Sequence, residues 1–400
     1  MAIFLIAVGL YWRSLFGRPI WDDHVLIDQS QIGGHTVWQV LTGHVLLLYY
    51  RPLTGLSYFV DGTLFGRDPV GFHATSILIH ALASMAVAWA AYRILSCRAA
   101  GFFAGLVFAA QPAQVAATAW IGGRTDDLSC LFVAAFTACL FEFLIGKRSM
   151  FLAVSAVFFF CAIGAKEQNL ALVPLAPIAA HAAGVKKLKD SLKITAPFLA
   201  AACLFLAPFF LYKSNVMRSG ALPIAHELQR IGDSSLHYSK LLFLPDSNAI
   251  EAFSLKAYGT VSTTSLGLIL LTGYVAAASF TIRSNPRIGF VLWAALLAYF
   301  PASNVVPAPS LIVAPYRVAV AGVFVAILIS YGLVVGYRTK QHVLSLVAAA
   351  CIVLGVYWTI AGIGLWLDEA DFFKISATGE RTGTPAMGKI SNLGGDQEIG

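Results

Sequence analysis

The chain has 400 residues, of which 58% are hydrophobic and only 12% are charged, and its mean hydropathy is +0.76. About a quarter of the residues in soluble domains are charged, so this composition excludes a soluble globular protein and predicts a polytopic membrane protein. The net charge of +7 does not indicate nucleic-acid binding, because the lysines and arginines lie in short loops between apolar runs.

Eleven apolar runs are candidates for membrane helices. None shows the period-two alternation of a membrane barrel, so we predict an all-α bundle of about 11 transmembrane helices over residues 1–367. The first run is short enough to be a signal-peptide core, but no small-residue cleavage site follows it, which favours a helix. The runs lie at about 2–16, 71–92, 101–119, 128–145, 150–165, 168–184, 194–212, 264–282, 288–303, 311–336 and 343–367.

Residues 18–70 form a long first loop between two of these runs. Apolar residues spaced at helical intervals over 37–48 predict an amphipathic helix that lies along the membrane surface, and Pro52 predicts a break after it. We therefore expect a structured loop that carries interfacial helices.

Two further segments lie outside the runs. Residues 213–263 contain a mixed stretch at 226–244 that is compatible with a second interfacial helix or a re-entrant helix. Residues 368–400 are rich in Gly, Ser and Thr, and they predict a flexible tail without a packed core.

The charge pattern predicts the orientation of the bundle. With a cytoplasmic N-terminus, five short inner loops carry 12 of the 27 basic residues, and the only acids on that side are Glu142 and Asp190. Glu142 is expected to snorkel to the interface or to pair with Lys147 or Arg148, and it is the acid that would suit a transporter. The basic residues are Arg93, Arg98, Lys147, Arg148, Lys186, Lys187, Lys189, Lys193, Arg283, Arg287, Arg338 and Lys340.

Asp22 and Asp23 stand where the first apolar run gives way to the external loop, and His24 follows them. Two adjacent carboxylates at a membrane interface are costly to hold unless they bind a ligand or react, so they predict a functional site. A solvated pair in a loop is the alternative. Paired aspartates suit Mg²⁺ or Mn²⁺ as well as a proton, so a metal role stays open.

Two short external turns carry further charges. In the first, Arg124 precedes Asp126 and Asp127; these acids are either substrate-binding groups or helix caps, and Arg124 either binds phosphate or pairs with Asp127. In the second, Lys166 is a candidate phosphate ligand, whereas Glu167 fits a structural ion pair better.

Arg51 and Arg317 are the other candidate phosphate ligands on the external side, because a guanidinium group matches phosphate geometry and keeps its charge. Tyr50 and Asp61 lie near Arg51 in the first loop and are candidate substrate-binding or structural residues. His73, on the second run, is more typical of a hydrogen-bonded core residue than of a metal ligand.

Three blocks of sequence stand in a fixed order along the chain. They are YYRPLTGLSYFVDGTLFGRDPVGFHATSILIHALAS (49–84), FAAQPAQVAATAWIGGRTDDLSCLF (108–132) and GAKEQNLALVPL (164–175). As a set they resemble blocks of the bacterial membrane proteins related to the transmembrane, TPR-repeat protein O-mannosyltransferases, which are similar to glycosyltransferase family 39. The resemblance covers roughly residues 10–320.

This resemblance implies a GT-C type membrane glycosyltransferase in a bacterial inner membrane, with its active site on the periplasmic side. Such an enzyme transfers a sugar, with inversion, from a polyprenyl-phosphate donor to a hydroxyl group of a protein or of an envelope glycan or lipid. Its partners are the lipid-linked donor, that acceptor and membrane lipids, with no nucleic acid. Asp22 or Asp23 would act as the general base, and arginines such as Arg51 and Arg124 would steady the leaving phosphate.

The chain also departs from the family pattern. Relatives carry His-Pro where this chain has Gln111-Pro112, an acid where it has Ala116, and Asp-Arg-Tyr where it has the segment 314–317; they also carry TPR repeats after the membrane part. A non-catalytic relative that binds lipid-linked sugars is therefore an alternative. A polytopic lipid or solute transporter is another, although the chain lacks the repeated halves that many transporters show.

Overall fold

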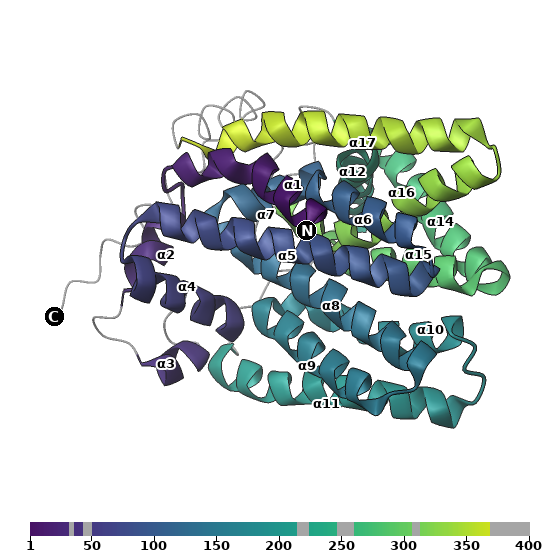
Figure 1. The fold of residues 1–400 in the computed structure, drawn as a ribbon, viewed down its shortest axis with the longest axis horizontal. Helices are drawn as coiled ribbons and strands as arrows, with labels where there is room; N and C mark the ends of the chain where they lie inside the picture. The colour runs from purple at the N-terminus through teal and green to yellow at the C-terminus, as the bar shows by residue number, and fades with distance from the viewer. Residues whose placement is uncertain (32–35, 43–49, 214–223, 246–259, 306–312, 369–400) are drawn as a thin grey trace.

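The computed structural model describes residues 1–31, 36–42, 50–213, 224–245, 260–305 and 313–368, and the regular elements of this part of the chain are α-helices and short 3₁₀ turns. The helices are α1 (Ala2–Tyr11), α2 (Asp23–Gln29), α3 (Val37–Leu41), α4 (Pro52–Phe65), α5 (Pro69–Leu95), α6 (Arg98–Ala109), α7 (Val115–Ala119), α8 (Arg124–Gly146), α9 (Ser149–Ala165), α10 (Leu175–Ala182), α11 (Leu188–Lys213), α12 (Ile224–Phe243), α14 (Val261–Ser284), α15 (Pro286–Tyr299), α16 (Ala319–Arg338) and α17 (His342–Ile363). Figure 1 shows them as one elongated bundle.

Six of the described helices are long and apolar enough to cross a membrane, namely α5, α8, α11, α14, α16 and α17. A seventh span is formed if α6 and the segment Pro112–Ala119, which are bent by 53° at their junction, are counted as one. The protein is therefore an all-helical, multi-pass membrane protein with six or seven candidate spans. The structure does not show the eleven spans that the apolar runs predicted.

The remaining runs form shorter pieces. Ala2–Phe16, Ser149–Ala165 and Pro286–Ala302 are apolar helices of at most 17 residues, and a helix of 17 residues is only about 26 Å long, less than a hydrocarbon core of ~30 Å. The run 168–184 is divided into the 3₁₀ turn Glu167–Leu172 and the eight-residue α10, with Pro174 at the break. Proline has no N–H group with which to continue a helix from the preceding turn.

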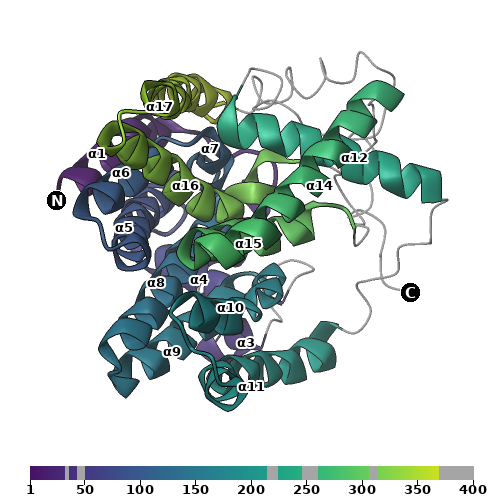
Figure 2. The ribbon, with the colours of Figure 1, turned by 90° about the vertical axis from the view of Figure 1, so that its right-hand side faces the viewer.

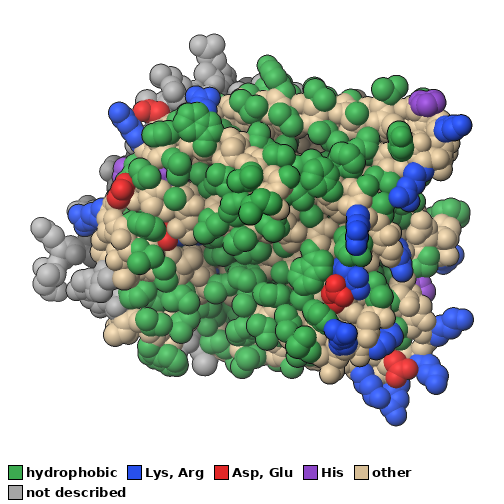
Figure 3. Space-filling model, in the orientation of Figure 1, with side chains coloured by type: hydrophobic (Ala, Val, Ile, Leu, Met, Phe, Trp, Pro, Cys, Tyr) green, Lys and Arg blue, Asp and Glu red, His purple; other side chains and the backbone are tan. Residues whose placement is uncertain are grey.

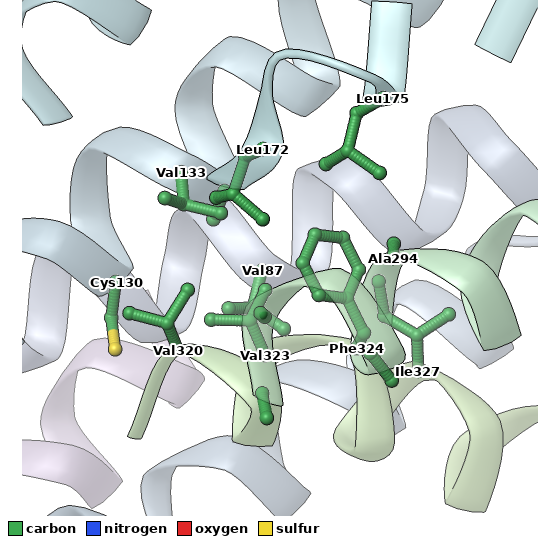
Figure 4. Close-up of a cluster of buried hydrophobic side chains, with 14 of the residues drawn as sticks. Val87, Cys130, Val133, Leu172, Leu175, Ala294, Val320, Val323, Phe324 and Ile327 are labelled. Carbon is green, nitrogen blue, oxygen red and sulfur yellow. The ribbon is translucent and has the colours of Figure 1, made fainter. Parts of the chain in front are cut away.

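The core of the bundle lies where α5, α8, α10, α15 and α16 meet. Figure 4 shows Val87, Val133, Leu175 and Phe324 converging there from four of these helices, and all four side chains are buried. In contrast, α14 and α17 are mostly exposed along their apolar lengths. Figure 2 shows α17 near one edge of the bundle, and α12 and α14 together on another flank. Apolar faces of this kind suit contact with lipid.

The bundle has two chemically different ends. In Figure 3, Lys and Arg side chains gather at the right-hand end and hydrophobic side chains cover the middle. We call the right-hand end, which carries the 12 basic residues named above, the basic end. The opposite end holds α2, α3 and α4 of the first loop and the turns at 120–124, 165–167 and 314–318 (Figure 1), and we call it the loop end.

The first loop is helical, as predicted, but its helices do not have the predicted boundaries. Only Val37–Leu41 of the predicted helix 37–48 is seen as α3, which a capping box between Thr36 and Gln39 begins; residues 43–49 lie outside the described residues. Tyr50 and Arg51 are not helical, and Pro52 is the first residue of α4, where its fixed φ angle suits the helix and its missing N–H costs nothing.

The mixed stretch predicted at 226–244 forms α12, while 214–223, 246–259 and 369–400 lie outside the described residues. At the basic end, Glu142 pairs with Arg93 of α5 (Nη2 to Oε2, 2.7 Å) and accepts a hydrogen bond from Trp89 Nε1. The predicted partners Lys147 and Arg148 were wrong, because the packing of α8 against α5 presents Glu142 to the side of α5.

Candidate functional site

Asp23 is the first residue of α2, and it ties the first loop to the turn that precedes α8. Its side chain is only 1% exposed; Oδ2 accepts a hydrogen bond from Ile20 N (3.0 Å), and Oδ1 accepts one from Gly122 N (2.9 Å). Burial raises the pKa of Asp23 to about 7, although the two N–H groups oppose that rise. Both carboxylate oxygens are therefore already used to hold the backbone.

Asp22 differs from its neighbour. It is half-buried, burial raises its pKa, and no residue in the described part of the chain forms a hydrogen bond or an ion pair with its carboxylate. The preceding Trp21 has a φ of 54° in a turn closed by a hydrogen bond from Asp23 N to Ile20 O. A bulky residue rarely adopts this conformation, so the surrounding contacts must hold it.

A cluster of aromatic rings continues from this turn. Trp21 stacks on Trp120 with the ring centroids 5.5 Å apart and the planes 12° from parallel. Trp120 also contacts Trp366 (5.6 Å) and Tyr316 (5.7 Å), and Tyr316 presents its ring to Lys166 Nζ at 5.5 Å. The cluster thus connects the turn that carries Asp22 to the cation at Lys166.

Two ion pairs lie at the same end of the bundle. Lys166 Nζ is 2.6 Å from Asp126 Oδ1. Arg51 donates two hydrogen bonds to Glu167, from Nε to Oε2 and from Nη2 to Oε1, both at 2.8 Å. Burial acts to raise the pKa of Glu167, but Arg51 and Lys166 outweigh it, so the pKa lies below its usual range. Burial lowers the pKa of Lys166 despite Asp126. The four charges sum to zero.

Arg124 is fully buried, and its three guanidinium nitrogens face the protein. Nη1 pairs with Asp61 Oδ2 (2.6 Å), Nη2 donates to Phe72 O (2.7 Å), and Nε donates to Ser76 Oγ (3.2 Å); the guanidinium carbon also lies 4.6 Å from the centre of the Tyr58 ring. Arg124 therefore joins α4, α5 and α8. It does not pair with Asp127, and its enclosure argues against the predicted phosphate role.

Asp127 lies inside the bundle, away from Asp126 and its partner. Its Oδ1 accepts a hydrogen bond from Thr118 Oγ1 (3.1 Å) and lies 3.4 Å from His80 Nδ1, and both side chains of the His80–Asp127 pair are fully buried. The other ring nitrogen of His80 lies 3.3 Å from Ala109 O. These contacts join α5, α7 and α8 through Asp127.

Arg317 lies in the 3₁₀ turn Pro315–Val318, next to Tyr316 of the aromatic cluster. Nη1 donates to Asn304 Oδ1 (3.2 Å) and Nη2 donates to Pro301 O (3.1 Å), and 9% of the residue is exposed. Both of these acceptors are neutral oxygens. Asn304 is itself held with a φ of 60°.

The other predicted residues lie at the edges of this arrangement or inside the bundle. His24 is exposed on α2, Tyr50 is buried against Phe205 and Phe209 of α11, and His73 is buried in α5. In the described ranges no three His, Cys, Asp or Glu residues are placed to hold a metal ion. Each carboxylate oxygen of Asp23 accepts one backbone N–H group.

Sequence analysis missed Trp120, Tyr316 and Trp366. Aromatic residues at the outer ends of membrane helices are usually interfacial anchors. With that interpretation, nothing in the sequence indicates that these three rings contact each other. The usable signal was the position of Trp120 directly before a turn with two glycines, since such a turn places a large ring against nearby backbone.

No family model matches the chain. It is 31% identical to the Homo sapiens protein O-mannosyl-transferase TMTC1 over 140 residues, 34% identical to Drosophila melanogaster Tmtc1 over 123 residues and 32% identical to Mus musculus TMTC2 over 145 residues. These matches cover 31–34% of this chain and 12–17% of those proteins, so they span about a sixth of the relatives' length.

Among solved structures, the apo oligosaccharyltransferase of Archaeoglobus fulgidus aligns with a TM-score of 0.49 and 14% identity, over 98% of this chain and 59% of that one. ArnT of Cupriavidus metallidurans bound to undecaprenyl phosphate aligns with a TM-score of 0.48 and 15% identity, over 95% and 78%. The sequence matches are the firmer finding: over about a third of its length, the chain is a distant homologue of the TMTC protein O-mannosyl-transferases.

Proposed function

We propose that the chain is a GT-C type glycosyltransferase that moves a sugar from a polyprenyl-phosphate donor to a hydroxyl acceptor at the loop end. The sequence similarity to protein O-mannosyl-transferases supports this reaction class. The observation that carries the proposal is the state of Asp22. Asp23 binds backbone N–H groups and Asp126 and Glu167 pair with cations, whereas the Asp22 carboxylate has no partner in the described part of the chain.

In the proposed reaction Asp22 removes the proton from the acceptor hydroxyl, whose oxygen forms a bond to the anomeric carbon of the sugar. The bond from that carbon to the phosphate oxygen breaks, and polyprenyl phosphate leaves with the bonding electrons. Attack opposite to the leaving group inverts the anomeric centre. Burial raises the pKa of Asp22 and makes it a stronger base than an exposed aspartate. The rate should therefore rise with pH through that pKa.

We assign the leaving phosphate to Arg317, because Lys166 is committed to Asp126. Arg317 donates to neutral oxygens that a phosphate can replace. It directly follows Tyr316, whose ring faces Lys166. Arg51 and Arg124 are committed to Glu167 and Asp61, so they suit positioning better than phosphate binding. Fixed cations at the developing phosphate charge stabilise the transition state.

Arg317→Gln is expected to lower transfer about 10²-fold, because it removes a cation aimed at the leaving group. The measurement is transfer from radiolabelled polyprenyl-phosphate sugars in membranes that carry each variant. Arg67→Gln is the matched control, since Arg67 lies at the same end but in an exposed pair with Asp28. Full activity of Arg317→Gln would contradict the assignment.

The proposed orientation places the loop end outside a bacterial inner membrane, since the basic end should stay in the cytoplasm. After replacement of the six native cysteines, His24→Cys at the loop end and Lys147→Cys at the basic end each present one exposed thiol. A membrane-impermeant maleimide is expected to label His24→Cys in intact spheroplasts and Lys147→Cys only after permeabilisation. The reverse pattern would move the site to the cytoplasm.

A non-catalytic relative that binds lipid-linked sugars is the second candidate. Gln111, which stands where relatives carry His, accepts a hydrogen bond from Gln114 Nε2 (3.4 Å), and Gln114 Nε2 also donates to Ala319 O of α16. Ala116 is buried in apolar surroundings. If wild-type membranes bind polyprenyl phosphate but transfer sugar from no donor, this second candidate is favoured.

A further inference from the structure

Trp120 carries a hydrogen-bond donor that the protein does not use. Its residue is 6% exposed, and its Nε1–H group is buried without a hydrogen-bond partner in the described structure. An indole N–H only donates, and leaving a buried donor unmet costs about 1–3 kcal/mol. Native proteins leave few such groups unmet, and those that remain call for an explanation.

The position of this donor connects it to the site. Trp120 lies between Trp21, which adjoins Asp22, and Tyr316, which adjoins Arg317. It therefore stands between the proposed base and the proposed phosphate ligand.

The Cζ2–Cε2 part of the indole, which adjoins Nε1, lies against Gly122. A Cβ atom added to Gly122 would lie 2.5 Å from Cζ2 and 2.6 Å from Cε2 of Trp120, and Cε2 is the atom bonded to Nε1. Gly122 N–H is itself the donor to Asp23. Only glycine at position 122 therefore allows the indole edge to lie beside the backbone that holds the acidic pair.

We propose that Trp120 is a substrate-binding residue whose Nε1–H donates a hydrogen bond to an oxygen atom of the lipid-linked donor sugar. This inference rests on the proposed function and deepens it by naming a group that recognises the donor.

Two kinds of oxygen on the donor can accept this hydrogen bond, a sugar oxygen and a phosphate oxygen. The phosphate is expected to face Arg317, so the Trp120 N–H group is left to the sugar. Polyprenyl phosphate with and without the sugar separates the two sources. A sugar contact affects only the first ligand, and a phosphate contact affects both.

Trp120→Phe tests the proposal because phenylalanine keeps an aromatic ring in the stack and removes the N–H group. We expect about tenfold weaker binding of a synthetic polyprenyl-phosphate sugar and unchanged binding of polyprenyl phosphate. The melting temperature without ligand should stay the same or rise, since an unmet donor is removed. Trp366→Phe, a change of the same size in the same stack, is the control and should bind both ligands like the wild type.

Binding is measured on the detergent-solubilised full chain as a ligand-induced shift in melting temperature, so transfer is not required. Equal binding of the lipid-linked sugar by Trp120→Phe and the wild type would overturn the inference. An equal loss in Trp366→Phe would overturn it too, because stacking alone would then explain the effect. If the wild type binds neither ligand, the proposed function itself fails.

Discussion

Asp22→Asn is expected to abolish most of the sugar transfer, by about 10²–10⁴-fold, and to leave the fold intact. The size follows from the usual contribution of a general base. The fold should persist because the Asp22 carboxylate makes no hydrogen bond or ion pair within the described structure that asparagine would lose. Transfer from radiolabelled polyprenyl-phosphate sugars and the melting temperature of the purified variant, measured together, check both parts.

Asp23→Asn is the matched comparison, and we expect a different result. An asparagine oxygen can accept from either Ile20 N or Gly122 N, but its amide nitrogen then faces the other donor. The buried N–H left unmet should cost about 1–3 kcal/mol of stability, and activity should fall because the turn that holds Asp22 loosens. Equal losses of transfer at unchanged stability in both variants would contradict the assignment of Asp22 as the base.

Asp23 also predicts how stability depends on pH. Its pKa is about 7 in the folded chain and 3.8 as the reference for the unfolded chain, so the folded state binds the proton more tightly between these values. Stability should therefore be greatest below about pH 4 and should fall by about 4 kcal/mol as the pH rises through 7. In Asp23→Asn this part of the pH dependence should be absent.

Apolar run length was sufficient to predict the six long spans, because within lipid a long apolar segment has few alternatives to a helix. It was not sufficient for the run 168–184, where composition is uniformly apolar but Pro174 divides the segment. It also could not separate full spans from the short apolar helices α1, α9 and α15. Those boundaries depend on which helices pack around the core.

The sequence also predicted that basic side chains gather on one side of the bundle, and Figure 3 shows many Lys and Arg side chains at its right-hand end. It did not predict the partners. Arg51 pairs with Glu167, which is 116 residues away in the sequence, and Lys166 pairs with Asp126, which is 40 residues away. Local spacing favoured neighbours such as Arg124 with Asp127, but helix packing decides which side chains face each other.

Arg124→Met is expected to destabilise the protein by about 3–5 kcal/mol, the largest stability effect we predict. Methionine fills a similar volume, but it leaves the carboxylate of Asp61 buried with only Thr75 Oγ1 as a hydrogen-bond donor. A buried charge whose partner is removed costs this much. Denaturation of the purified variant in detergent measures the loss.

The double variant Arg124→Met, Asp61→Asn separates charge from packing. If the cost is the unpaired carboxylate, the neutral asparagine should recover part of the stability lost in Arg124→Met. Arg67→Met is the control, since its pair with Asp28 is largely exposed and should contribute at most about 1 kcal/mol. If instead Arg124→Met keeps wild-type stability and loses only the binding of polyprenyl phosphate, then Arg124 reaches the donor, and the phosphate role that the sequence suggested for it is right.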